Sequence, residues 1–288
     1  MRWRREKRME FVPISLKSGE TIENMRKIAR HKASSHAFVS LYLWKESMGL
    51  SVAFSKDAFL VKSKDGYFFP CGDEADVIAF VKAVWEREPS ARFLYAREED
   101  ASLVKRVFGE AVTADFDAAS REYLYLKSEQ IAMSGKKFTY QRAKVNKAKR
   151  LGEIRSELID QTLLPIAESI TKAWADNRED KGDYQETLEA LANFEALKLY
   201  GNLLYLDEKP IGFNLGSFLS DDTFDIHIAK TLVDDVDTLM KLYLYQALPE
   251  RVVTINREED LGIRGLAIHK QDAQPCGFND TYILSLKE

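Results

Sequence analysis

Gly201-Asn-Leu-Leu-Tyr-Leu206 is the first of three short, β-rich runs that decide the fold of this chain. The other two are Pro210-Ile-Gly-Phe-Asn-Leu-Gly216 and Thr223-Phe-Asp-Ile-His-Ile228, and the polar turn Asp207-Glu-Lys209 separates the first run from the second. Short apolar runs with turn residues between them are typical of neighbouring antiparallel strands. Residues 201–228 therefore predict a three-stranded meander.

The elements around this meander occur twice in the same order. In the second half we expect helices at 159–175 and 184–198, the meander, a helix at 234–248, a strand at 251–255, a helix at 258–270 and a strand at 281–286. The first half predicts helices at 21–30 and 34–44, a meander within 50–70, a helix at 73–88, a strand at 91–95, a helix at 98–108 and strands at 111–116 and 122–126. A repeated order of this length indicates duplication.

The duplication predicts two domains of α/β (α+β) class, with mixed, mostly antiparallel sheets flanked by helices. We place the N-terminal domain at residues 1–133 and the C-terminal domain at 134–288, with the joint between Leu126 and Ile154. The order of meander, helix and strand resembles the GNAT, or acyl-CoA N-acyltransferase, fold. We therefore predict tandem GNAT-like domains, which by itself leaves the chemistry open.

Composition narrows the class of protein. The chain has 288 residues, of which 45% are hydrophobic and 31% charged, and its formal net charge is −4. These values are typical of a folded protein and give no overall reason to bind nucleic acid. Cys71 and Cys276, the two cysteines, lie far apart and form no metal motif, so we expect a reducing compartment and no metal. No apolar run is long enough to span a membrane, and we expect a cytoplasmic protein.

One segment between the predicted domains is strongly basic. Gly135-Lys-Lys-Phe-Thr-Tyr-Gln-Arg-Ala-Lys-Val-Asn-Lys-Ala-Lys-Arg150 combines seven cations with two aromatic residues. Cations neutralise phosphates and aromatic rings stack on bases, so the segment is a candidate for binding RNA phosphates. A solvated helix face is the alternative, because runs of like charge are commonly just exposed.

A second charged segment follows a predicted strand. The strand Val252-Val-Thr-Ile255 ends in Asn256-Arg-Glu-Glu-Asp260, and ligands of open α/β sheets bind at strand ends. Arg257 suits a carboxylate or phosphate, whereas Glu258, Glu259 or Asp260 suits a cationic amine. We assign Asn256 and Glu259 mainly to capping of the helix expected at 258–270.

His227 lies in the third strand of the second meander. Alternation along the strand places Asp225 and His227 on one face, opposite Ile226 and Ile228. A histidine facing a cleft can take a proton from an attacking amine, although a single histidine is more often a packing residue.

Four sequence features together resemble the family of phosphatidylglycerol lysyltransferase C-terminal-domain-like proteins, long described as a domain of unknown function. The matching features are Tyr67-Phe-Phe-Pro-Cys-Gly72; Glu122-Tyr-Leu-Tyr125 with Gly135-Lys-Lys137, Arg142 and Asn146; Ile226-His-Ile-Ala-Lys230; and Ile255-Asn-Arg-Glu-Glu-Asp-Leu-Gly-Ile-Arg-Gly-Leu266. The resemblance extends from about residue 13 to the C-terminus. It departs from the family pattern after Leu266, where Ala267, Ile268 and Ala273 replace the usual basic residues and tyrosine.

The resemblance implies tandem GNAT domains and transfer of an amino acid from aminoacyl-tRNA to a lipid-linked or small acceptor, with tRNA as partner, peripheral contact with a lipid substrate and no other cofactor. We expect His227, Lys230, Arg257 and Glu258 to act in catalysis, and Asp260 and Lys270 to bind substrate. Lys136, Lys137, Arg142 and Asn146 are expected to bind tRNA phosphates. Two alternatives are an acyl-CoA N-acyltransferase and a non-catalytic binding protein of this fold.

Acyl-CoA is the less favoured donor. In the GNAT fold a glycine-rich turn at a helix N-terminus binds the pyrophosphate through backbone N–H groups. The corresponding turn here, Lys230-Thr-Leu-Val-Asp-Asp-Val-Asp-Thr238, has no glycine and three aspartates that repel a pyrophosphate.

Overall fold

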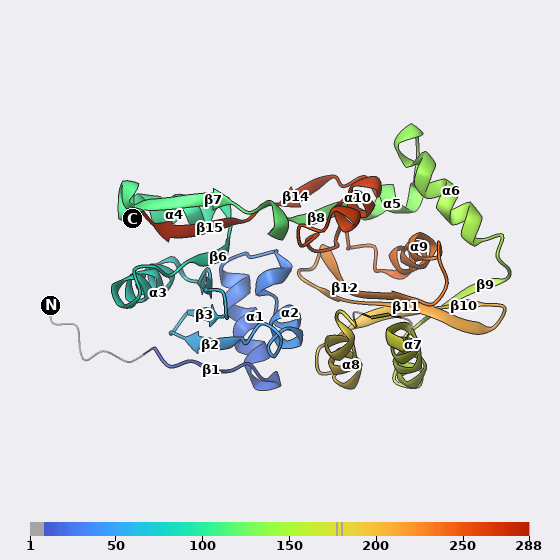
Figure 1. Cartoon of the computed structure of the whole chain (residues 1–288), viewed down its shortest axis with the longest axis horizontal. Coiled ribbons are helices and arrows are strands. Elements are labelled where there is room, and N and C mark those ends of the chain that lie inside the picture. The colour runs from blue at the N-terminus through green and yellow to red at the C-terminus, as the bar shows by residue number, and fades with distance from the viewer. Residues whose placement is uncertain (1–8, 177, 180, 288) are drawn as a thin grey trace. The chain divides into compact units, whose positions relative to one another are not determined.

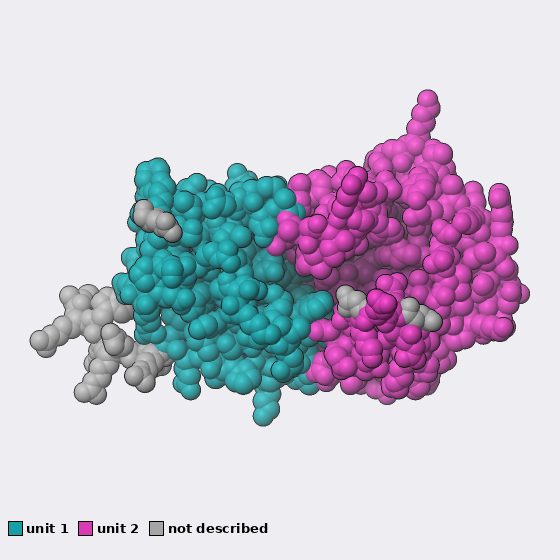
Figure 2. Space-filling view, in the orientation of Figure 1, with its two compact units in different colours: residues 1–118, 280–288 teal, residues 119–279 magenta. Residues whose placement is uncertain are grey.

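The computed structural model describes residues 9–176, 178–179 and 181–287. The chain forms two compact units, which Figure 2 colours separately. Unit 1 comprises residues 1–118 and 280–288, and unit 2 comprises residues 119–279. In the described part of the chain, no helix combines the length and the apolar character needed to cross a membrane.

Unit 1 is an eight-stranded mixed sheet with helices. The sheet has the order β1-β2-β3-β4-β6-β15-β7, and β5 pairs with β3. Its strands are β1 (Val12–Pro13), β2 (Ser51–Phe54), β3 (Ala58–Lys62), β4 (Tyr67–Phe68), β5 (Cys71–Gly72), β6 (Phe93–Ala96), β7 (Val112–Phe116) and β15 (Tyr282–Leu286). Its α-helices are α1 (Gly19–Ile28), α2 (Phe38–Leu43), α3 (Glu74–Arg87) and α4 (Glu98–Phe108). Asp73 is the N-cap residue of α3, and its carboxylate accepts a hydrogen bond from the Ala75 N–H.

Unit 2 is a seven-stranded mixed sheet with the order β14-β8-β13-β12-β11-β10-β9. Its strands are β8 (Glu122–Leu126), β9 (Ile154–Leu158), β10 (Tyr200–Leu206), β11 (Lys209–Phe218), β12 (Thr223–Thr231), β13 (Thr254–Asn256) and β14 (Gly277–Asn279). Its α-helices are α5 (Lys127–Ala132), α6 (Thr139–Ala148), α7 (Leu164–Asp176), α8 (Tyr184–Ala192), α9 (Asp237–Ala247) and α10 (Arg264–Asp272). Figure 1 shows α7 and α8 on one side of this sheet and α9 on the other. The meander predicted from residues 201–228 is β10, β11 and β12.

The two units share one order of elements. In each, a meander is followed by a helix and a strand parallel to the last meander strand, namely β4 with β6 in unit 1 and β12 with β13 in unit 2. A further helix and a strand follow, as α4 and β7 or as α10 and β14. The duplicated fold class predicted from the sequence, two mixed sheets flanked by helices, is confirmed.

The boundaries of the units differ from the domains that we placed at 1–133 and 134–288. Strand β8, expected to close the first half, pairs with β13 and β14 in unit 2. Strand β15, expected to close the second half, pairs with β6 and β7 in unit 1. Each half of the chain therefore gives one strand to the other half's sheet. Sequence periodicity identifies a strand but not its partner, because the inward-facing pattern suits either sheet.

Unit 1 buries a group of polar side chains beside its apolar core. His31 and His36 are both buried, with ring centroids 4.2 Å apart. His36 Nε2 donates to the Phe69 carbonyl, whereas neither ring nitrogen of His31 has a hydrogen-bond partner among the described residues. Burial lowers the pKa of His36 to about 4 and that of His31 well below its usual value, and the nearby Arg26 and Arg97 act in the same direction.

These histidines predict acid sensitivity. Unfolding restores an ordinary histidine pKa near 6.5, so between pH 6.5 and about 4 the unfolded chain binds more protons. The free energy of unfolding should fall with decreasing pH in this window by up to about 1.4 kcal/mol per pH unit for each histidine. Urea denaturation of the full chain at a series of pH values measures this dependence. His31→Phe, which removes a titrating group that has no hydrogen bond, should flatten the dependence; an unchanged slope in this variant would contradict the assignment.

Candidate functional site

The site is built where two parallel strands of unit 2 diverge. Strand β12 pairs with β13 over three residues only, and the last pair is Asp225 with Asn256. Strand β13 ends there, while β12 continues to Thr231 beside β11. Side chains at this point lie at the carboxyl end of β13, the position where open α/β sheets bind ligands.

A β-bulge in β12 sets the direction of the His227 side chain. Leu215 pairs with Ile228 and Gly216 with Ile226, so His227 has no partner in β11. The bulge needs a glycine opposite it, because a Cβ atom at Gly216 would lie 2.0 Å from the Asp225 carbonyl oxygen. The side chains of Asp225 and His227 nevertheless meet on one face, as alternation along the strand predicted, because His227 Nδ1 lies 3.4 Å from Asp225 Oδ2.

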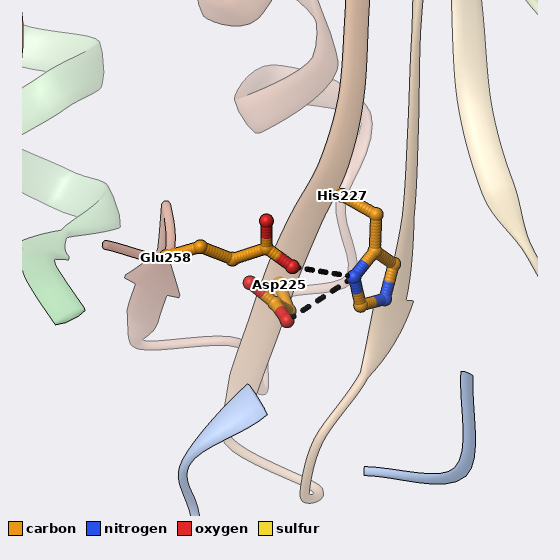
Figure 3. A group of neighbouring side chains, drawn as sticks. All are labelled: Asp225, His227 and Glu258. Atoms are coloured by element: carbon orange, nitrogen blue, oxygen red, sulfur yellow. Dashed lines mark hydrogen bonds and ion pairs between the residues drawn. The ribbon is translucent and has the colours of Figure 1, made fainter. Parts of the chain in front are cut away.

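His227 is held through both ring nitrogens. Its Nε2 lies 2.8 Å from Ser217 Oγ, and its Nδ1 lies 2.9 Å from Glu258 Oε1 and 3.4 Å from Asp225 Oδ2. Figure 3 shows both carboxylates directed at the same side of the imidazole. The His227 side chain is only 3% exposed, whereas that of Glu258 is 20% exposed, so access to this group is through Glu258.

Negative charge accumulates around His227. Asp225 is completely buried, and neither of its carboxylate oxygens has a hydrogen-bond partner among the described residues. Burial, and then the nearby Glu258, Glu122 and Glu259, hold the pKa of Asp225 well above its usual value. Burial, and then Glu258 and Glu122, raise the pKa of Glu259 to about 8. This acid–histidine cluster (Asp225, His227, Glu258 and Glu259) is therefore suited to hold protons or a cation.

The segment directly after β13 is an irregular loop. The helix that we expected at 258–270 was therefore placed too early in the chain. Helix α10 begins only at Arg264, and Glu258 and Leu261 have positive φ angles of 58° and 55°. The predicted capping role of Asn256 is also wrong. Its Oδ1 accepts from the Glu258 N–H across a turn, and its Nδ2 donates to Glu122. Glu259 lies near the other acids of the cluster instead of capping a helix.

Lys270 and Asp260 hold this loop in place. The buried Lys270 ammonium donates to the carbonyls of Arg257 and Glu259. Asp260 accepts from the Tyr123 hydroxyl at 2.6 Å and from the Gly262 N–H at 2.8 Å. Both residues were expected to bind substrate, and the structure places each of them in contacts that fix the loop carrying Glu258.

Arg257 and Glu258 are adjacent in sequence, but their side chains lie in different parts of unit 2. The Arg257 side chain lies in a small polar cavity of about 20 Å³, room for about one water molecule, lined by α5, α6, α9 and α10. There its Nη2 lies 3.1 Å from His269 Nε2, and its guanidinium lies over the Tyr125 ring. Arg257 therefore does not join His227, contrary to the catalytic group that we expected.

Lys230 is also remote from His227. Its ammonium pairs with Asp183 and lies 3.7 Å from the centre of the Trp174 ring, against α7. Burial lowers the pKa of Lys230. Of the four predicted catalytic residues, the structure brings together only His227 and Glu258.

The basic segment forms a short 3-10 helix at Lys136–Phe138 followed by α6. Arg142 donates to the carbonyls of Met133 and Gly135, and Lys137 and Lys147 pair with Glu129 and Asp235. Asn146 is exposed. In the described part of the chain, the exposed cations of this segment without an ion pair are Lys136, Lys149 and Arg150.

The sequence did not point to Ser217, and it placed Glu122 in a family motif without predicting its contact with the site. Ser217 contacts His227 because β11 pairs with β12. Glu122 contacts Asn256 because β8 pairs with β13 in the sheet of unit 2. The Asp225-Ile-His227 spacing and the charged motif that contains Glu258 were the sequence signals for the cluster.

Fold and site together define a tandem α/β protein with a polar centre at the divergence of two parallel strands. The family described as phosphatidylglycerol lysyltransferase, C-terminal, matches residues 26–284. The chain therefore belongs to this family, as the sequence motifs predicted. A comparison with curated proteins gives no match.

Several solved structures share the fold. A conserved protein of unknown function from Bacteroides thetaiotaomicron has a TM-score of 0.87 at 24% identity, with 97% of this chain and 100% of that chain covered. L-PGS from Bacillus licheniformis has a TM-score of 0.67 at 17% identity, covering 93% and 92%. FemX has a TM-score of 0.58 at 10% identity, covering 96% and 97%. At these identities the likeness shows a common fold.

Lys270 offers a test of the loop's structure. The variant Lys270→Met leaves the carbonyls of Arg257 and Glu259 without their charged donor. We therefore expect its free energy of unfolding to fall by about 3 kcal/mol. Urea denaturation measures this. Lys149→Met, at an exposed position, is the matched control and should change stability by less than about 0.5 kcal/mol. Equal stabilities of the two variants would show that Lys270 does not hold the loop.

Proposed function

We propose that this protein transfers an aminoacyl group from aminoacyl-tRNA to an amine or hydroxyl of a lipid-linked or small acceptor. The observation that carries the proposal is the acid–histidine cluster, in which His227 is held by Ser217 and Glu258 at the end of β13. Membership of the phosphatidylglycerol lysyltransferase C-terminal family supports the choice of an aminoacyl donor.

The chemistry requires little beyond positioning and proton transfer. An aminoacyl ester is already activated, so the acceptor's nitrogen or oxygen attacks the ester carbonyl, the bond to the ribose oxygen breaks, and tRNA leaves with a free hydroxyl. The acceptor's proton passes to a carboxylate of the cluster, which then returns a proton to the departing ribose oxygen. Glu258 and Glu259 are placed for this because they are its partly exposed acids. The negative cluster also attracts the ammonium group of the aminoacyl moiety.

The N-terminus of α9 gives a reason to favour this donor over acyl-CoA. Asp237 occupies its first turn and pairs with Lys241, and Asp235 in the preceding turn pairs with Lys147. A pyrophosphate approaching this helix end meets carboxylates instead of free backbone N–H groups. Acetyl-CoA is therefore the control donor in the assays below.

The unpaired cations of the basic segment should contribute to tRNA binding. In the triple variant Lys136→Ala, Lys149→Ala and Arg150→Ala, we expect weaker binding and a logarithmic salt slope smaller by about 2, since each phosphate contact adds roughly 0.7 to 0.9. Filter binding of charged tRNA over a salt series measures both quantities. Lys147→Ala is the matched control, because Lys147 is already paired with Asp235. A parent chain without salt-dependent binding would favour the non-catalytic alternative.

Transfer itself should depend on Glu258. Glu258→Gln keeps the shape of the side chain but removes its basicity, and we expect the transfer rate to fall by about 100-fold or more while tRNA affinity is unchanged. The measurement is release of labelled amino acid from tRNA in the presence of pooled amine and hydroxyl acceptors. Asp183→Asn, which alters the Lys230 pair away from the cluster, should retain the rate. A Glu258→Gln variant as fast as the parent would place catalysis elsewhere.

A further inference from the structure

Three side chains of the cluster are arranged like the ligands of a metal ion. A carboxylate oxygen of Asp225, Nδ1 of His227 and a carboxylate oxygen of Glu258 all lie within 4.8 Å of one another. The distances from Nδ1 to Glu258 and to Asp225 are 2.9 and 3.4 Å. A tetrahedral ion with bonds of about 2.1 Å separates its ligands by roughly 3.4 Å, so small movements would admit one.

Asp225 is an independent sign that a cation belongs here. It is completely buried, and both its oxygens are without a hydrogen-bond partner among the described residues. A buried carboxylate without a hydrogen-bond partner lowers the stability of the fold, and buried charges in proteins are normally paired or bind metals. Nδ1 of His227 lies 3.4 Å from Asp225 Oδ2.

His227 is oriented as a metal ligand would be. Its Nε2 lies 2.8 Å from Ser217 Oγ, so an Nε2–H that donates to Ser217 leaves the lone pair of Nδ1 directed at Asp225 and Glu258. Metal-binding histidines characteristically donate their second ring N–H in this manner, which fixes the tautomer and the ring. No metal motif is visible in the sequence because the three ligands come from β12 and the loop after β13.

We propose that Asp225, His227 and Glu258 bind a divalent cation of the Zn²⁺ or Mn²⁺ class, with an open coordination position on the side of Glu258. One imidazole and two carboxylates suit these ions, and three protein ligands with a free position are the pattern of catalytic sites. Binding of the ion stands apart from the proposed function. Its role rests on that function: the ion would polarise the ester carbonyl of the donor.

Isothermal titration calorimetry of the full, chelator-treated chain with ZnCl₂, MnCl₂ and MgCl₂ tests the site. We expect one Zn²⁺ or Mn²⁺ ion per chain. Asp225→Asn and His227→Asn should each weaken binding at least tenfold, and Ser217→Ala, which removes the partner of Nε2, about tenfold. His269→Gln is the matched control, because His269 lies 3.3 Å from Asp237 in a second histidine–aspartate pair. This variant should bind like the parent.

Thermal unfolding keeps the test independent of folding defects. Asp225→Asn replaces an unpartnered buried carboxylate by a neutral group of the same shape, so its Tm without metal should equal or exceed that of the parent. The increase in Tm on adding Zn²⁺ should be present in the parent and absent in the variant. No binding by the parent, or equal binding by the parent and both ligand variants, would overturn the proposal. A chain that binds the ion but transfers no aminoacyl group would refute only the proposed function.

Discussion

The parallel pairing of β12 with β13 over three residues is the constraint on which the site depends. It ends at Asp225 and Asn256, and beyond that end Glu258 of the loop meets the bulged His227. Asn256 links this point to Glu122 of β8, and Lys270 of α10 holds the loop carbonyls. A longer β13 would have continued the sheet across the position that Glu258 now occupies.

Accumulated negative charge is the main energetic feature of this centre. Asp225, Glu258 and Glu259 share a buried region with one histidine and one lysine, and burial with mutual repulsion raises the pKa of Asp225 and of Glu259. Such an arrangement costs stability unless a proton, an ammonium group or a metal ion compensates the charge. Strained or costly arrangements of this kind are common at functional sites.

The exchange of strands connects the duplicated fold to the site. Strand β8 carries Glu122, Tyr123 and Tyr125 into unit 2, where they contact Asn256, Asp260 and the carbonyl of Lys270. Strand β15 takes the equivalent place beside β6 in unit 1. The acid–histidine cluster of unit 2 thus depends on a strand from the first half of the chain. A boundary drawn at residue 133 would have separated β8 from the cluster that it supports.

The sequence by itself determined the duplication, the meanders and the family, because apolar periodicity and the motif at residues 255–266 are local properties of the chain. It also identified His227 and Glu258 as members of one site. Only the tertiary structure decided that Arg257 and Lys230 lie elsewhere, that Lys270 and Asp260 hold a loop, and that Ser217 contacts the His227 ring. These outcomes depend on strand partners, a β-bulge and positive φ angles. Each of them is set by contacts between residues distant in sequence, which local patterns do not encode.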